Sequence, residues 1–172
     1  MTETFGHASA SRKVLVVGLG NPDRGDDGIG VIVTRSLIGR LPSDVAIMAR
    51  SSDMLSLIED WGSFDALICA DATAPMGAPG RIHRIDLATG ALPNNISPTS
   101  SHSLGIADAI ALARTLKCAP HDIIVYAIEG CCFSGGAPVT PQVATAAGEV
   151  ADNIIADVIR LRRGSAEAVS HV

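Results

Sequence analysis

Three short segments of the sequence carry side chains able to hold a metal ion or to move a proton. Asp26 and Asp27 end a glycine-rich turn that follows the apolar run 14–17, Asp71 follows a second apolar run, and His102 lies in a serine-rich segment. Carboxylates are hard anionic ligands or acid/base groups, and imidazole is the commonest transition-metal ligand among side chains. Together they predict a mixed oxygen and nitrogen site for a divalent first-row metal.

Each segment also has a purely structural interpretation. An aspartate in the first turn of a helix caps free N–H groups, which explains one of Asp26 and Asp27 but covers the second less well. Asp71 is equally able to end a strand, and His102 to help its neighbouring serines cap a helix. Glycines in the turn permit a tight bend, and we expect them to clear space for an approaching group.

The elements that must position these side chains alternate along the chain. Apolar runs and helical periodicity predict strands at 13–18, 44–49, 66–70, 80–87 and 122–128, and helices at 26–39, 54–61, 103–116 and 141–161. This order predicts an α/β fold with a mostly parallel sheet and helices on both faces. Because parallel strands bring their carboxyl ends to one edge, Asp27, Asp71 and His102 can meet there.

Bulk composition restricts the class of protein. The 172 residues are 47% hydrophobic and 18% charged with a net charge of −5, which predicts one well-buried domain and disfavours a nucleic-acid partner. We expect a single α/β domain at 13–163, a flexible leader at 1–12 and a flexible tail at 164–172. No export signal or membrane span is evident, so a cytoplasmic location and free thiols are expected, the vicinal pair Cys131 and Cys132 included.

The motifs, taken in order, resemble the maturation endopeptidases of nickel–iron hydrogenases. The matching segments are Gly18-Leu19-Gly20-Asn21, Asp26-Asp27, Leu67-Ile68-Cys69-Ala70-Asp71-Ala72 and Ser101-His102-Ser103-Leu104-Gly105. The resemblance implies a three-layer fold, similar to phosphorylase/hydrolase-like proteins, with a twisted five-stranded sheet between helices. It implies a hydrogenase large-subunit precursor as partner and removal of its C-terminal extension after nickel insertion.

In that family the residues that contact the metal match Asp27, Asp71 and His102, which we therefore predict as both catalytic and metal-binding. The resemblance implies that the nickel belongs to the substrate, and other divalent ions are expected to substitute for it. The chain lacks HExxH and GxSxG signatures, which favours metal-assisted hydrolysis without an acyl-enzyme. Asp27 or its neighbour Asp26 is the expected acceptor of the proton from water.

Substrate recognition is where the chain departs from the family. Many members carry an Asp-Gly-Gly-Thr-type stretch after the second strand, whereas this chain has Ala49-Arg50-Ser51-Ser52-Asp53. Arg50 and Asp53 are candidate recognition residues, although an ordinary polar loop also explains them. Asp26 and Glu129 are further candidates, since both are expected at the same edge of the sheet. A monomer is the expected oligomeric state.

Three other functions share some of these features. The opening Gly18-Leu19-Gly20-Asn21-Pro22 also resembles peptidyl-tRNA hydrolases, but Ser36 stands in Thr34-Arg35-Ser36-Leu37 where those enzymes need a histidine. A dinucleotide-binding turn would need a third glycine at Asp23. A nickel-handling chaperone that binds the precursor without cleaving it would use the same three ligands, and the sequence leaves this alternative open.

Overall fold

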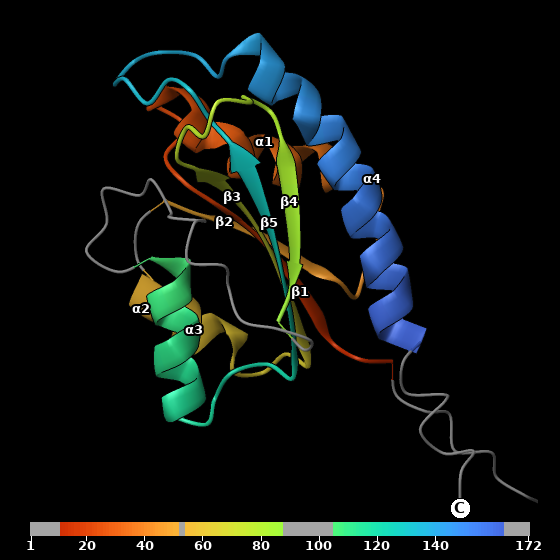
Figure 1. The fold of residues 1–172 in the computed structure, drawn as a ribbon. Coiled ribbons are helices and arrows are strands. Elements are labelled where there is room, and N and C mark those ends of the chain that lie inside the picture. Colours follow the sequence, from red (N-terminus) through yellow and green to blue (C-terminus); the bar gives the residue numbers. More distant parts are fainter. Residues whose placement is uncertain (1–10, 52–53, 88–104, 164–172) are drawn as a thin grey trace, which may run out of the picture.

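A five-stranded sheet between two pairs of helices forms the core of the computed structural model, which describes residues 11–51, 54–87 and 105–163 (Figure 1). The strands are β1 (Val14–Leu19), β2 (Ala46–Arg50), β3 (Ala66–Thr73), β4 (Ile82–Asp86) and β5 (Asp122–Glu129). The helices are the 3-10 turn η1 (Gly25–Gly28), α1 (Ile29–Leu37), α2 (Met54–Trp61), α3 (Ile106–Thr115) and α4 (Pro141–Arg163). The sheet order is β2-β1-β3-β5-β4, with only β4 antiparallel among these strands. The predicted three-layer α/β fold with a mostly parallel sheet is confirmed.

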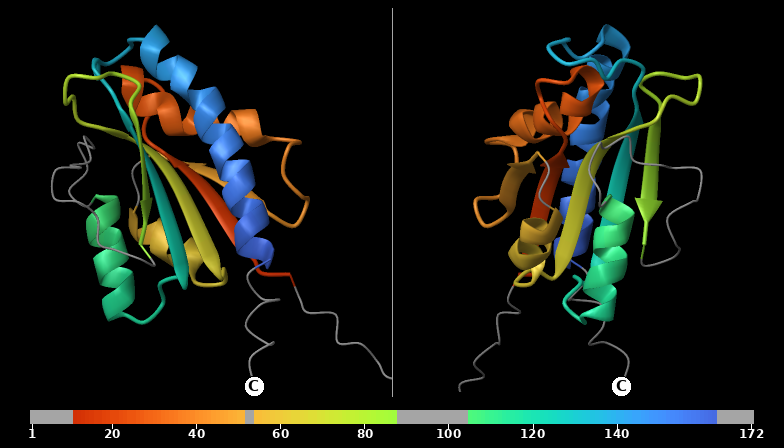
Figure 2. Two further views of the ribbon diagram at one scale, coloured as in Figure 1. Left: turned by 45° about the vertical axis from the view of Figure 1, so that its right-hand side comes forward. Right: turned by 90° about the vertical axis from the view of Figure 1, so that its left-hand side faces the viewer.

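The sheet separates two hydrophobic cores (Figure 2). Helices α1 and α4 cover one face, and α2 and α3 cover the other. Alternation along each strand produces this division, because successive side chains of a strand point to opposite faces. On β1, Val14 and Val16 pack under α1 and α4, whereas Leu15 and Val17 pack under α2 and α3. All six residues of β1 are buried, as expected for a central strand of a parallel sheet.

Two predicted boundaries next to the candidate site are wrong in an informative way. The helix expected from Asp26 begins as the 3-10 turn η1, and the α-helix starts only at Ile29. The strand expected to stop before Asp71 continues to Thr73, because its pairing with β5 extends as far as Thr73 opposite Glu129. Asp71 therefore lies inside β3 rather than in a loop after it.

The strand predicted at 80–87 forms β4, which pairs with β5 at one edge of the sheet. The expected flexible ends, 1–12 and 164–172, fall almost entirely outside the described residues. None of the described helices has the length and apolar character needed to cross a membrane.

Candidate functional site at the carboxyl edge of the sheet

Asp27 and Asp71 come together at the carboxyl ends of β1 and β3. Asp27 lies in η1, which follows β1, and Asp71 lies near the end of the adjacent strand β3. The side chains are almost fully buried, with residue exposures of 2% and 5%. Burial, and next the negative charge of Asp27, raise the pKa of Asp71 to about 7. The predicted meeting of these two carboxylates is therefore present in the structure.

Local backbone groups orient both carboxylates. The Asn21 N–H donates to Oδ2 of Asp27 over 2.9 Å, and the Ala72 N–H donates to Oδ1 of Asp71 over 2.8 Å. The bond from Ala72 lowers the pKa of Asp71 but does not offset burial and the nearby charge. Two buried carboxylates in such proximity favour either a shared proton or a bound cation.

Asp26 has a different environment from its neighbour Asp27. Its Oδ2 accepts the N–H groups of Cys131 and Cys132, and its Oδ1 accepts both the N–H and the hydroxyl of Thr140. Burial alone would raise the pKa of Asp26, but these bonds outweigh it and lower the pKa. A carboxylate so fully bonded is a weak base, and it ties η1 to the loop that follows β5. This geometry favours a supporting role for Asp26; direct substrate recognition stays an untested prediction.

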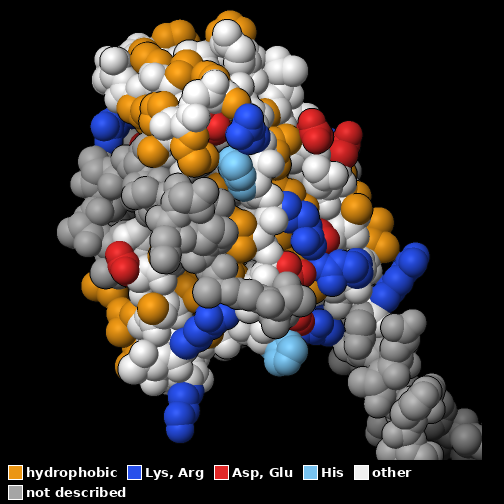
Figure 3. All heavy atoms as spheres, viewed as in Figure 1, with side chains coloured by type: hydrophobic (Ala, Val, Ile, Leu, Met, Phe, Trp, Pro, Cys, Tyr) orange, Lys and Arg blue, Asp and Glu red, His pale blue; other side chains and the backbone are white. Residues whose placement is uncertain are grey.

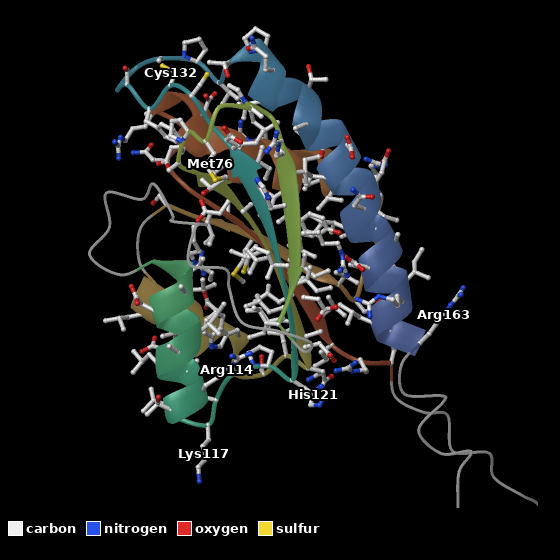
Figure 4. All side chains as sticks on the ribbon, viewed as in Figure 1. Met76, Arg114, Lys117, His121, Cys132 and Arg163 are labelled. Carbon is white, nitrogen blue, oxygen red and sulfur yellow. The ribbon has the colours of Figure 1, made fainter. Side chains whose placement is uncertain are left out.

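Glu129 plays a similar part on the other side of the edge. It is fully buried at the end of β5, and its Oε1 accepts the N–H groups of Met76 and Ala78, each over 2.6 Å. Burial opposes ionisation, but these N–H groups lower the pKa of Glu129. The carboxylate thus fixes the loop between β3 and β4. Met76 and Cys132 lie at the same end of the molecule in Figure 4, where these two loops meet.

The other predicted recognition and site residues are placed as follows. The Arg50 guanidinium lies at the end of β2 and donates from Nε to Asp60 of α2 over 3.0 Å. Asp53 and His102 lie outside the described residues. The described part of the chain holds no group of three or more His, Cys, Asp or Glu side chains arranged for a metal ion. Of the predicted three-residue set, the structure describes Asp27 and Asp71.

The expectation that the turn glycines clear space for a ligand is wrong. A Cβ atom on Gly18 would lie 2.1 Å from the Gly30 carbonyl oxygen, and one on Gly20 would lie 1.8 Å from the Asp27 carbonyl oxygen. Gly20 also has φ of +112°, which disfavours other residues. The glycines therefore let α1 and η1 pack directly against β1, and this close packing holds Asp27 beside β3.

Sequence reasoning did not single out Thr140 or His83. Thr140 stands one residue before the predicted helix start and anchors Asp26. His83 falls within the strand predicted at 80–87, and alternation along β4 places it on the same face as Ile85. The pairing of β4 with β5 was the missing information, because it brings His83 level with Asp71.

The fold and the buried pair of carboxylates together define an α/β protein with a candidate site at the carboxyl edge of its sheet. Comparison with known proteins shows what the chain is similar to. The chain is 36% identical over 107 residues to the hydrogenase 2 maturation protease of Escherichia coli, a match that spans 59% of this chain and 63% of that relative. Over the matched part, the chain is therefore similar to a hydrogenase maturation protease, and it spans less than two thirds of that relative's length.

Solved structures share the fold over most of their length. The hydrogenase maturating endopeptidase HybD from E. coli superposes with a TM-score of 0.73 at 24% identity, covering 86% of this chain and 93% of that one. An endopeptidase from E. coli solved in solution gives a TM-score of 0.72 at 25% identity, covering 89% and 93%. The [NiFe] hydrogenase maturation protease HycI from Thermococcus kodakarensis gives 0.69 at 21%, covering 88% and 95%. No protein-family model matches the chain.

Proposed function

We propose that this protein is an endopeptidase that removes the C-terminal extension of a nickel–iron hydrogenase large-subunit precursor after nickel insertion. The main support for this proposal is the buried pair Asp27 and Asp71 at the edge of the sheet, where the pKa of Asp71 is raised to about 7. Similarity to proteins named as hydrogenase maturation proteases supports the reaction class and the precursor as partner. The nickel in this proposal belongs to the substrate.

Asp27, Asp71 and His102 contact that nickel and so bring the scissile peptide bond to the edge of the sheet. Two carboxylates whose charges oppose one another gain most from a divalent cation, because it neutralises both at once. A precursor without nickel lacks this contact, so cleavage is restricted to the loaded substrate. The ion can polarise the scissile carbonyl or acidify a water molecule.

Asp27 is the preferred acceptor of the proton from that water. Asp26 is poorly suited, because four hydrogen bonds and a lowered pKa hold its carboxylate in the charged form. Asp71 is the second choice, since its raised pKa lets it carry a proton near neutral pH.

The test compares nickel-loaded with nickel-free precursor and follows release of the C-terminal peptide by mass spectrometry. We expect cleavage of the loaded precursor only, and its loss in Asp27→Ala and His102→Ala. Asp152→Asn is the matched control, because this exposed carboxylate on α4 pairs only with Arg40 among the described residues. Equal cleavage of both precursors would reject nickel gating, and full activity of either site variant would reject the assignment.

The same experiment separates cleavage from simple binding. A nickel-handling chaperone would retain the loaded precursor through Asp27, Asp71 and His102 and leave its C-terminus intact. Tight binding of loaded precursor with no peptide release over many hours would therefore replace the protease proposal with that alternative.

A further inference from the structure

His83 lies in the same row of the sheet as Asp71. Ala127 of β5 pairs with Asp71 on one side and with His83 of β4 on the other. Paired residues of neighbouring strands point to the same face, here the face of α2 and α3 to which Ala127 and Ile85 belong. Two strand spacings of about 4.8 Å put the Cα atoms of Asp71 and His83 roughly 10 Å apart.

The residue between them is small. Ala127 is buried at 3% exposure and lies between two longer side chains, at the edge where the carboxyl ends of β3 and β5 lie. The loops beside this row are fixed in place, because Asp26 binds the backbone of the loop after β5 and Glu129 binds the backbone of the loop between β3 and β4. The row therefore holds His83 at a fixed position relative to Asp71.

The imidazole of His83 lacks a partner on its outer nitrogen. Nε2 is shielded from solvent and has no hydrogen-bond partner within the described ranges. A buried polar atom without a partner is costly and is uncommon in native structures unless function requires it. Since the described residues contain no three-residue metal cluster, His83 is not part of a preformed ion site there.

We propose that His83 is a further substrate-binding residue, whose Nε2–H donates a hydrogen bond to a backbone carbonyl of the precursor beside the scissile bond. The proposal rests on the proposed function for its substrate, a peptide whose cleaved bond lies at Asp27 and Asp71. The bond is present in the ground state as well as in the transition state. Its loss therefore raises KM and leaves kcat nearly unchanged.

Three variants test the proposal in the full-length protein with nickel-loaded precursor. His83→Leu keeps the volume but removes the donor, and we expect its KM to rise about tenfold, the scale of one hydrogen bond. His83→Gln retains an N–H donor at similar reach and is expected to restore most of the affinity. His121→Gln is the control, because His121 is exposed at the opposite end of the molecule (Figure 4).

A readout independent of cleavage separates this proposal from the protease assignment. The imidazole ¹⁵N resonance of His83 is followed while a peptide spanning the precursor's C-terminal junction, or the whole precursor, is added. A shift at His83 but not at His121 supports the contact even if no peptide bond is cut. An unchanged KM in His83→Leu, equal defects in His83→Leu and His83→Gln, or no shift at saturating precursor would each overturn it.

Discussion

Two buried carboxylates on opposite faces of the sheet illustrate how differently the fold treats charge. Asp157 of α4 faces β4 and β5, where its oxygens accept the Tyr126 hydroxyl at 2.6 Å and two Arg84 nitrogens at 2.8 and 2.9 Å. Burial would raise the pKa of Asp157, but these partners lower it. Asp71 on the other face has the opposite balance, and its pKa is raised to about 7.

The difference assigns a separate role to each face. Around Asp157, acidic and basic side chains lie side by side along β4 and α4, as Figure 3 shows, and they fasten the long helix to the edge of the sheet. Around Asp71 the partners among the described residues do not compensate for burial, so the pKa of Asp71 stays raised. A group left in this state by a well-packed fold is a candidate for function.

The largest expected effect is on catalysis at Asp71. Asp71→Asn keeps the shape of the side chain but removes the charge proposed to contact the substrate's nickel, so kcat/KM should fall on the order of 10²–10⁴-fold. The same change removes a poorly compensated buried charge, so the protein should become more stable near neutral pH. Peptide release and urea unfolding measure the two effects. If Asp71→Asn loses stability as well as activity, the charge of Asp71 is compensated in the fold as that of Asp157 is, and the difference between the two residues is wrong.

The pH dependence of stability should carry opposite signs for the two carboxylates. Between the ordinary aspartate pKa of about 4 and the folded value of about 7, Asp71 holds a proton that the unfolded chain has released. Its contribution to the unfolding free energy therefore falls as pH rises through this interval, by on the order of 2–4 kcal/mol. The stability from Asp157 is present above the unfolded pKa and is lost as pH falls through its lowered folded pKa.

Urea unfolding between about pH 4 and pH 8 tests this sign. Asp71→Asn should remove the decline toward neutral pH, whereas Asp157→Asn should weaken the loss of stability in acid. Identical pH dependences of the unfolding free energy for the wild type and Asp71→Asn would show that the pKa of Asp71 is not raised in the folded protein.

The sequence predicted the features of the fold and site that depend on neighbouring residues, but not those that depend on contacts between residues far apart in the chain. Local patterns predicted the five strands and four α-helices of the described residues but not the 3-10 turn η1, because apolar runs, helical periodicity and helix-ending residues act over a few neighbours. Topology then predicted that Asp27 and Asp71 meet. The different fates of Asp26 and Asp27 were beyond local rules, since Asp26 is satisfied by Thr140, more than a hundred residues away. The row through Ala127 likewise required the register of β4, which follows no local pattern.

Removing Asp157 should destabilise the protein without touching the site. Asp157→Asn leaves the Tyr126 hydroxyl and the Arg84 guanidinium without their charged partner, which costs about 2–3 kcal/mol in the free energy of unfolding. Cleavage measured well below the melting temperature should stay near the wild-type rate, because α4 covers the other face of the sheet. Loss of activity in the folded variant would indicate that the two faces are coupled.

The adjacent aspartates of η1 provide a closer comparison within one turn. Asp26→Asn places an amide NH₂ against N–H donors of Cys131, Cys132 or Thr140, and should cost about 2 kcal/mol of stability. Asp27→Asn can keep the single bond from the Asn21 N–H, so its stability should change little while cleavage is lost. Thermal unfolding of the two variants, paired with the peptide-release assay, distinguishes the supporting residue from the catalytic one. Equal stability losses would remove the distinction.

Arg50 offers the smallest effect and decides whether the ion pair at the end of β2 serves only packing. Its guanidinium and the Asp60 carboxylate are partly exposed, at 37% and 29% of their side-chain areas. Such pairs contribute about 0.5 kcal/mol, because water screens them and both side chains lose freedom. Arg50→Gln and Asp60→Asn should therefore lower the unfolding free energy by the same small amount. If Arg50 also contacts the precursor, only Arg50→Gln will raise KM, since Asp60→Asn frees the guanidinium without removing it. Equal KM values for both variants and the wild type would show that Arg50 contributes to packing and not to binding of the precursor.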